Sequence, residues 1–167
     1  SGFFPRRKPD AHKGTYGHLL VVAGSLGKSG AAALAGRAAL RSGVGLCTVA
    51  TAVSQQPIVA GFSMEVMTEA LAETAAQSIS FRAKDLVLEL ASQRDAVALG
   101  PGLSLDPESQ ALARALVAEL DRPMVVDADA LSALAGHLDL LGDAPAPRVL
   151  TPHPGEMARM LGTSIAE

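Results

Sequence analysis

The feature that most constrains the fold is a series of short apolar segments, each ended abruptly by glycine, proline, aspartate or threonine. These segments are Leu19–Val22, Leu46–Ala50, Ala96–Leu99, Met124–Val126 and Val149–Leu150. Their apolar residues are continuous and do not alternate with polar ones, which indicates strands that are covered on both faces. The pattern therefore predicts a parallel sheet buried between helices.

Segments with helical patterns lie between these strands. They are Ser29–Ser42, Glu65–Ala76, Ala83–Ser92, Asp106–Leu120 and Pro154–Leu161. Gly43 and Gly162 follow two of them in the position of a helix-ending glycine, whereas Gly142–Pro147 is expected to be a loop. Alternation of strands and helices predicts right-handed crossovers and an α/β fold, with a parallel central sheet and helices on both faces.

Composition and charge exclude several classes of partner. The formal net charge is −3 and only 3% of the residues are aromatic, so the chain lacks both a basic field and stacking platforms for nucleic acid. The one basic cluster is Arg6-Arg7-Lys8, which we interpret as part of a solvated leader segment over residues 1–11. We therefore expect no nucleic-acid partner.

The cysteine content and the hydropathy pattern indicate the compartment. Cys47 is the single cysteine and lies within an apolar strand, so it is expected to be a core residue in a chain without intrachain disulfides. No apolar stretch approaches the ~20 residues that cross a bilayer, and no signal-peptide pattern is present. We expect a cytoplasmic protein with no membrane partner.

Small and polar residues gather where the predicted strands end. They are Gly24-Ser25, Gly100-Pro101-Gly102, Asp127 with Asp129, and His153 with Glu156. In open α/β sheets, ligands bind outside the carboxyl ends of the strands, where helix N-termini present free N–H groups. Chain turning alone explains any one of these loops almost as well, but it explains all of them together poorly. The set predicts a site for a phosphorylated, nucleotide-like ligand.

The glycine-rich turn from Gly24 to Ser29 resembles a P-loop but lacks its spacing. Only two residues separate Gly24 from Gly27, whereas the P-loop motif requires four before its Gly-Lys, and Gly-x-Gly-x-x-Gly is also absent. What remains is a turn that leads into a helix N-terminus and could hold a phosphate. Gly24 and Ser25 are the candidate phosphate-binding residues.

The segment Thr151–Glu156 carries the most specific pattern in the chain, because two prolines flank His153 and a carboxylate follows three residues later. His153 could donate a hydrogen bond to a ligand carbonyl or phosphate, and Glu156 could orient Mg²⁺. The alternative is that Glu156 only stabilises the first turn of a helix by its charge.

Several motifs stand together in an order that belongs to one family. They are His12–Gly17, Val21–Gly45, Gly100–Gly102, Asp127–Leu131 and Thr151–Glu156. The ordered set resembles the ADP- or ATP-dependent NAD(P)H-hydrate dehydratases, which have a carbohydrate-kinase-like domain of the ribokinase-like superfamily. The resemblance covers the chain from Phe4 to Glu167 and implies a ribokinase-like fold.

The resemblance also implies a function, which is the repair of nicotinamide nucleotides. Members use ADP, or ATP in some cases, with Mg²⁺ to dehydrate (S)-NADHX and (S)-NADPHX to NADH and NADPH, releasing AMP and phosphate. Carried over by motif, Ala31, Gly102 and His153 would contact the hydrated dinucleotide. Asp127 would join Gly24 and Ser25 near the phosphates, and Glu156 would be a metal ligand. The family also suggests a homo-oligomer, a tetramer in its known members.

One departure from the family pattern concerns the catalytic residue. The family places its catalytic aspartate in a Gly-Thr-Gly-Asp-type motif downstream of the His-Pro-Gly-Glu string, and this sequence has no counterpart. Ser164 and Glu167 also form a capping-box pattern at the very end of the sequence. We therefore expect residues 12–167 to be the N-terminal part of one dehydratase domain, with no catalytic residue, an uncovered sheet edge and no activity in isolation.

Two other functions fit the same residues less well. A small-molecule kinase of the same superfamily, acting on a vitamin precursor or a sugar, would keep the transferred phosphate on its product instead of releasing it. A non-catalytic nucleotide-binding module would bind its ligands without turnover.

Overall fold

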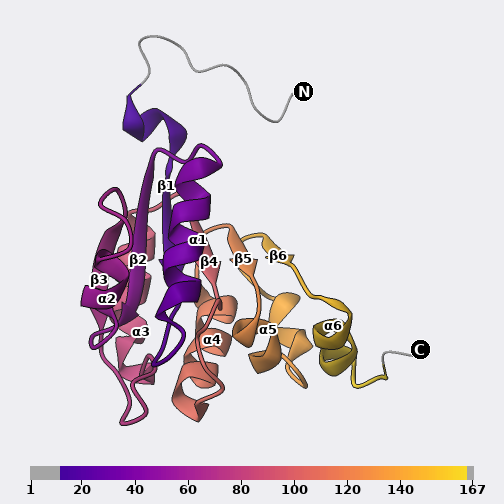
Figure 1. Ribbon diagram of the computed structural model, residues 1–167. Helices are drawn as coiled ribbons and strands as arrows, with labels where there is room; N and C mark the ends of the chain where they lie inside the picture. Colours follow the sequence, from indigo (N-terminus) through magenta and orange to yellow (C-terminus); the bar gives the residue numbers. More distant parts are fainter. Residues whose placement is uncertain (1–11, 165–167) are drawn as a thin grey trace.

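The computed structural model describes residues 12–164 and contains one six-stranded sheet. The strands are β1 (His18–Val22), β2 (Leu46–Ala52), β3 (Met67–Leu71), β4 (Ala96–Leu99), β5 (Met124–Val126) and β6 (Arg148–Leu150). Their order across the sheet is β3-β2-β1-β4-β5-β6, and every pair of neighbours is parallel. The predicted parallel sheet is confirmed, and Figure 1 shows it with the carboxyl ends of the strands along one edge.

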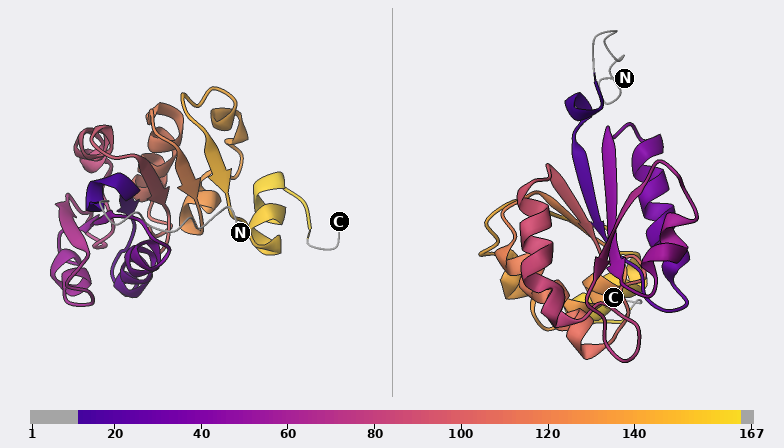
Figure 2. Two further views of the ribbon diagram at one scale, coloured as in Figure 1. Left: turned by 90° about the horizontal axis from the view of Figure 1, so that it is seen from above. Right: turned by 90° about the vertical axis from the view of Figure 1, so that its left-hand side faces the viewer.

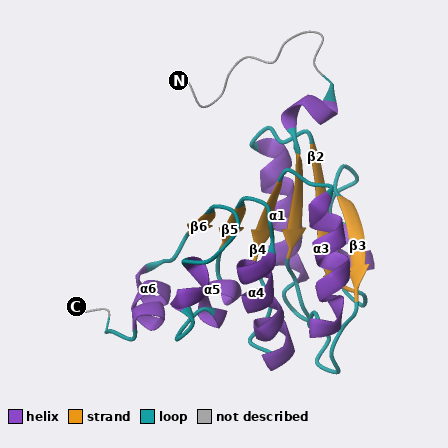
Figure 3. Cartoon of the chain, turned by 180° about the vertical axis from the view of Figure 1, so that it is seen from behind, coloured by secondary structure: helices purple, strands orange, loops and turns teal. Residues whose placement is uncertain are grey.

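Helices cover both faces of the sheet, as expected. They are α1 (Ser29–Arg41), α2 (Gln56–Ala60), α3 (Lys84–Ser92), α4 (Pro107–Glu119), α5 (Asp129–Ala133) and α6 (Pro154–Leu161). Short 3₁₀ turns occupy Lys13–Tyr16, Phe81–Ala83 and Leu138–Leu141. The edge-on view in Figure 2 and the rear view in Figure 3 show α1 on one face and α3 and α4 on the other. Gly43 and Gly162 have positive φ angles, as helix-ending glycines require.

The predicted helix over Glu65–Ala76 is wrong. Residues 67–71 form β3, which pairs with β2 from Thr48 opposite Met67 to Ala52 opposite Leu71. The helix of this region lies earlier, at α2, where Pro57 occupies the first turn. A five-residue stretch is too short for periodicity to separate a strand from a helix, and pairing along β2 overrides its helical propensity.

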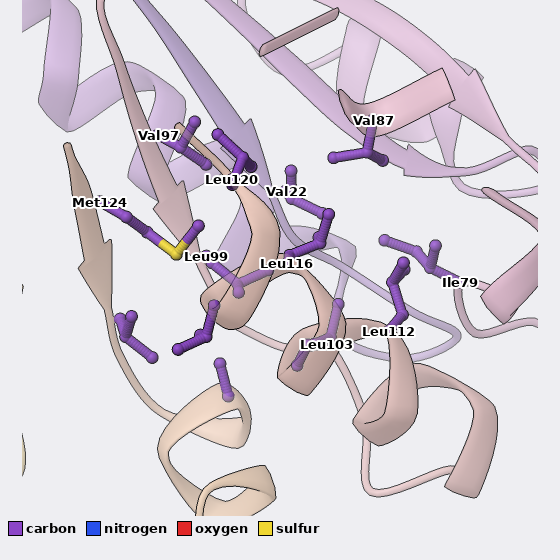
Figure 4. Close-up of a cluster of buried hydrophobic side chains, with 14 of the residues drawn as sticks. Val22, Ile79, Val87, Val97, Leu99, Leu103, Leu112, Leu116, Leu120 and Met124 are labelled. Carbon is purple, nitrogen blue, oxygen red and sulfur yellow. The ribbon is translucent and has the colours of Figure 1, made fainter. Parts of the chain in front are cut away.

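Two apolar cores fill the spaces between the sheet and its helices. The larger core lies under α3, α4 and α5, and Figure 4 shows part of it: Val22, Ile79, Val87, Val97, Leu99, Leu103, Leu112, Leu116, Leu120 and Met124. The smaller core joins β1 and β2 to α1 and α2, and it contains Cys47 as expected. Burial raises the pKa of the Cys47 thiol to about 11, so the residue stays an unreactive thiol near neutral pH.

One part of the sheet lies open. Val125 and Val149 point to the face covered by α1 and α2, and both are exposed, because these helices cover only the β1–β3 side of that face. In Figure 1 no helix lies over β5 and β6 from the side of α1. Within residues 12–164, β6 also pairs on one side only. In the described part of the chain, β6 is therefore an unpaired edge strand with an open apolar surface beside it.

Some sequence-based predictions fall outside the described residues. The leader over residues 1–11, with its basic cluster Arg6-Arg7-Lys8, lies there entirely, and so does Glu167 of the capping-box pattern. Among residues 12–164, none of the helices has the length and hydropathy needed to span a membrane.

His18 at the start of β1 couples folding to pH. Its Nε2 lies 2.8 Å from Thr48 Oγ1, and burial, with a smaller contribution from the nearby Arg94 charge, lowers its pKa although Asp95 opposes the shift. His18 of the unfolded chain becomes protonated as the pH falls through ~6.5, whereas His18 of the folded chain stays neutral to lower pH. The free energy that neutral His18 contributes to folding is therefore present above pH ~6.5 and is lost as the pH falls below it.

We therefore expect His18→Gln to reduce the loss of stability between about pH 7 and about pH 5, since glutamine does not titrate. Urea unfolding of both proteins at several pH values measures this, with His137→Gln, at an exposed position, as the matched control. An identical pH dependence in wild type and His18→Gln would contradict the assignment.

Candidate functional site

The loops that follow β1 and β4 are bound to each other at the carboxyl edge of the sheet. The Gly24 N–H donates to the Pro101 carbonyl at 3.0 Å, and the buried Ser25 hydroxyl donates to the Gly102 carbonyl at 2.8 Å. These two strands are neighbours in the sheet although their loops are far apart in the sequence. These hydrogen bonds hold together the two loops that carry Gly24, Ser25 and Gly102 of the predicted site.

The close packing of these loops requires glycine at two positions. Gly24 has φ +87°, and a Cβ added there would lie 2.7 Å from Thr51 Oγ1. Gly102 has φ +65°, and an added Cβ would lie 2.9 Å from the Lys28 carbonyl oxygen and 3.1 Å from Ala31 Cβ. The structure thus brings Ala31 and Gly102 together, with the β4 loop against the start of α1. A side chain at position 102 would collide with the start of α1, so glycine lets the β4 loop approach this helix closely.

Lys28 joins three loops, a role that its sequence context does not predict. Lys28 Nζ lies 2.9 Å from Asp129 Oδ2, and the same oxygen accepts a hydrogen bond from the Ser104 N–H at 2.9 Å. The ion pair links the turn before α1 to the first residue of α5, and Ser104 adds the β4 loop. Lysine in the glycine-rich turn was the visible signal, but no sequence pattern connects it to a carboxylate 101 residues away.

Asp127 directly follows β5 and is held by its main chain. Its N–H donates to the Leu99 carbonyl, and its carbonyl accepts from the Ala130 N–H. Its side chain, which is half-buried, makes no hydrogen bond or ion pair within residues 12–164. The next residue, Ala128, has φ +52°, a strained value for a residue with a Cβ. The turn therefore presents a free carboxylate at the edge of the sheet.

His153 and Glu156 form a capping box at the start of α6. His153 Nδ1 accepts from the Gly155 N–H at 3.1 Å and from the Glu156 N–H at 3.4 Å, while Glu156 Oε2 accepts from the His153 N–H at 2.9 Å. Because Nδ1 is an acceptor, the neutral ring carries its proton on Nε2. The His153 side chain is 66% exposed and that of Glu156 only 12%, so the imidazole is the accessible member of the pair.

The structure limits how phosphate could bind near Gly24 and Ser25. The Gly24 N–H and the Ser25 hydroxyl are both used in bonds to the β4 loop, so neither is a free donor. In the first turn of α1, which begins at Ser29, the Ala31 N–H donates to the Lys28 carbonyl at 3.1 Å, while the Ser29 and Gly30 N–H groups have no partner within residues 12–164. Phosphate recognition at this position would therefore use the helix N-terminus, with Gly24 and Ser25 shaping the turn that precedes it.

At the carboxyl ends of the strands, the acidic side chains could hold a metal ion only together with the phosphates of a bound substrate. No group of three or more His, Cys, Asp or Glu side chains in the described part of the chain is arranged for metal binding. Mg²⁺, however, commonly takes one or two protein carboxylates and completes its shell with water and substrate phosphates. The free carboxylate of Asp127 fits that kind of site, whereas Glu156 is already engaged with the His153 main chain.

The predicted site residues all lie at the carboxyl ends of the strands, but not all of them are in contact with one another. Gly24, Ser25, Ala31 and Gly102 form a packed group around the start of α1. Asp127 follows β5, and His153 follows β6, which is two strands away from β4. These residues therefore lie at the ends of four strands, β1, β4, β5 and β6, where dinucleotides bind in open α/β sheets.

Comparison with known proteins identifies relatives over almost the whole chain. Residues 19–167 match the family model of the NAD(P)H-hydrate dehydratases. A bifunctional NAD(P)H-hydrate repair enzyme of Moorella thermoacetica is 48% identical over 98% of this chain and 31% of its own length. The ADP-dependent (S)-NAD(P)H-hydrate dehydratase of Bacillus subtilis is 36% identical over 98% of this chain and 54% of its own.

Solved structures share the fold. The B. subtilis ADP/ATP-dependent NAD(P)H-hydrate dehydratase, co-crystallised with ATP and Mg²⁺, aligns with a TM-score of 0.74 and 31% identity over 99% of this chain and 55% of that one. A hypothetical protein of Streptococcus mutans aligns with a TM-score of 0.81 and 28% identity, over 99% and 56%. The chain thus spans about a third to just over half of the length of the relatives described here.

Proposed function

The chain belongs to the NAD(P)H-hydrate dehydratase family, and we propose that it serves the ADP-dependent dehydration of (S)-NADHX and (S)-NADPHX. The observation that carries the proposal is the packed contact of Gly102 with Ala31 and the start of α1. Gly102 and Ala31, which the family resemblance assigns to the hydrated dinucleotide, lie side by side at this helix N-terminus. The B. subtilis relative is named for the same reaction.

The proposed reaction removes water from the hydrated nicotinamide ring by way of a phosphate ester. The terminal phosphoryl group of ADP is transferred to the ring hydroxyl, and AMP is released. The ring C–O bond then breaks, phosphate departs with that oxygen, and loss of a proton restores the C=C bond. Positioning and electrostatic stabilisation dominate the catalysis of phosphoryl transfer. The protein must therefore hold the terminal phosphate of ADP next to the ring hydroxyl.

Residues of this chain would bind the hydrated dinucleotide. Gly102 and Ala31 are in contact beside the N-terminus of α1, where the unpaired N–H groups of Ser29 and Gly30 would favour a phosphate. The His153 imidazole is exposed, its Nδ1 is held by the α6 main chain, and its Nε2 lies 3.4 Å from Glu156 Oε1. Nε2 would donate to the ligand in place of that contact with Glu156. Gly24 and Ser25 shape the turn between β1 and α1.

Mg²⁺ would neutralise the charge that phosphoryl transfer develops. Asp127 would hold it, because the Asp127 carboxylate has no partner within residues 12–164. Glu156 would act through a water molecule at most, since one of its oxygens closes the α6 capping box. No residue of this chain is proposed as the catalytic base. The family resemblance places that aspartate in a motif without a counterpart in this sequence, so we expect binding without turnover from these 167 residues.

The cellular setting follows from the same proposal. A repair reaction that regenerates NADH and NADPH is needed where these cofactors are used, and the single buried thiol suits a reducing compartment. We therefore propose a cytoplasmic location. ADP is the proposed phosphoryl donor, as in the name of the B. subtilis enzyme.

The test is direct binding of hydrated NADH by titration calorimetry, with His153→Ala as the variant. Loss of the imidazole should weaken binding by about tenfold, the effect of one hydrogen bond to a charged group. It should also lower stability by about 1 kcal/mol, because the ring caps α6. Nicotinamide absorbance in the presence of ADP and Mg²⁺ reports turnover, which we expect to be absent.

His153→Asn is the matched control, since asparagine is a good N-cap but cannot supply a ring N–H at the same place. It should restore the stability and not the affinity. Equal affinities of all three proteins for hydrated NADH would refute the role of His153. A phosphorylated product retained after incubation with ADP or ATP would favour a small-molecule kinase instead.

A further inference from the structure

Asp129, the first residue of α5, joins three segments that meet at the carboxyl ends of the strands. Its Oδ2 atom accepts a hydrogen bond from the Ser104 N–H at 2.9 Å and lies 2.9 Å from Lys28 Nζ. Only 21% of the Asp129 side chain is exposed, against 46% of the Lys28 side chain. A largely enclosed carboxylate therefore connects α5 both to the turn before α1 and to the β4 loop, which spans residues 100–106.

The backbone around this carboxylate is strained. Within residues 12–164, only Gln77, Ser104 and Ala128 combine a side chain with a positive φ angle, at +55°, +90° and +52°. Ser104 donates the hydrogen bond to Asp129, and Ala128 directly precedes Asp129 in the chain. Such backbone conformations persist only where the surrounding structure fixes them, and they concentrate at functional sites. The Asp129 carboxylate is the group that fixes Ser104.

The third strained residue supports the turn before α1 from another side. The Gln77 carbonyl accepts a hydrogen bond from the Leu26 N–H at 3.0 Å, and Leu26 lies two residues before Lys28. All three strained residues are therefore next to this turn or to the carboxylate that holds it. The strain of the described chain is concentrated where the start of α1 is held in place.

The segments that Asp129 joins carry residues proposed to bind the hydrated dinucleotide. Gly102 lies two residues before Ser104, and a Cβ added to it would lie 2.9 Å from the Lys28 carbonyl oxygen, so the β4 loop touches the start of α1. Lys28 is the N-cap residue of α1. Without the bond to Asp129, Ser104 could leave its strained conformation, and Gly102 would then shift relative to the helix N-terminus.

We propose that Asp129 is a positioning residue for the hydrated dinucleotide. Its carboxylate acts through the Ser104 N–H and holds the β4 loop in the strained conformation that sets Gly102 against the start of α1. This inference rests on the proposed function. The negative charge of Asp129 by itself opposes the binding of a phosphate, so geometry and charge predict opposite effects when the carboxylate is removed.

Asp129→Asn and Asp129→Ala separate these two effects. Asparagine keeps an oxygen acceptor for the Ser104 N–H and loses the charge, whereas alanine loses both. In titration calorimetry with hydrated NADH, Asp129→Asn should bind at least as tightly as wild type, and Asp129→Ala at least about tenfold more weakly. Glu119→Ala removes the exposed Lys84–Glu119 pair, which is 2.8 Å long. It is the matched control and should bind like wild type.

Hydrogen exchange of the Ser104 amide, followed by NMR, tests the loop without any ligand. Exchange should be at least about tenfold faster in Asp129→Ala and within about threefold of wild type in Asp129→Asn. Circular dichroism checks that the variants are folded, and Asp129→Asn alone decides the matter if Asp129→Ala does not fold.

Two results would overturn the role of Asp129 in binding. One is an equal affinity of wild type and Asp129→Ala for hydrated NADH. The other is a loss of affinity in Asp129→Asn as large as in Asp129→Ala, because charge and not geometry would then be the cause. If the wild-type protein did not bind hydrated NADH, the proposed function would fail. The exchange of the Ser104 amide would then decide by itself whether Asp129 holds the loop, and unchanged exchange in Asp129→Ala would show that it does not.

Discussion

Replacing Gly100 by alanine should destabilise the protein more than any other change proposed for it. Gly100 lies between β4 and the loop that faces the site, with φ +124°, and a Cβ there would lie 1.9 Å from the Asp127 carbonyl oxygen and 2.7 Å from Ala130 Cβ. That carbonyl belongs to the neighbouring main chain and cannot rotate away. We expect a loss above about 4 kcal/mol, a large fraction of the ~5–15 kcal/mol by which a folded domain is stable.

Gly136→Ala separates the steric effect from backbone strain. Gly136 also has a positive φ, +77°, but an added Cβ would have no neighbour within 4 Å. The cost at that position should be about 1–2 kcal/mol, from the left-handed conformation alone. Urea unfolding followed by circular dichroism measures both variants. Equal losses would mean that the β4 and β5 loops move apart freely, and that Gly100 does not fix the site.

The strand ends could be predicted from sequence because their causes are local. A continuous apolar run ending at Gly100 or Asp127 identifies a buried parallel strand and its carboxyl end in a single short window. The fold class follows from the alternation of such windows with helical patterns. β3 was missed for the opposite reason, since its five residues become a strand only by pairing with β2.

The contacts inside the site depend on distant parts of the chain. The Lys28–Asp129 pair joins residues that the sequence gives no reason to connect. His153 caps α6 together with Glu156. The sequence indicates only a charge effect of Glu156 on this helix, because histidine is not among the common N-cap residues. Residue types therefore indicated which loops form the site, while hydrogen-bonding roles emerged only from the three-dimensional arrangement.

Arg148 should be the second large determinant of stability, although nothing in the sequence marks it. It starts β6 and reaches the end of α4, where its guanidinium donates to the carbonyls of Val117 (3.0 Å), Leu120 (2.6 Å), Arg122 (2.9 Å) and Ala146 (2.9 Å). The last carbonyls of a helix have no intrahelical partner. Arg148 therefore supplies hydrogen bonds that α4 lacks and attaches β6 to the rest of the sheet.

Arg148→Met should cost about 3 kcal/mol, because it keeps much of the aliphatic stem but leaves several partly buried carbonyls without a donor. Burial lowers the pKa of the Arg148 guanidinium, yet arginine stays charged at neutral pH, so the variant also removes a charge. Arg148→Lys keeps the charge and loses the planar fork, and it should recover less than half of the loss.

Arg114→Met, where a single 3.3 Å bond to Ala133 is removed, is the matched control and should cost under about 1.5 kcal/mol. Urea unfolding ranks the three variants. If Arg148→Lys were as stable as wild type, charge would be the cause, and the carbonyl cluster at the end of α4 would not need the geometry of arginine.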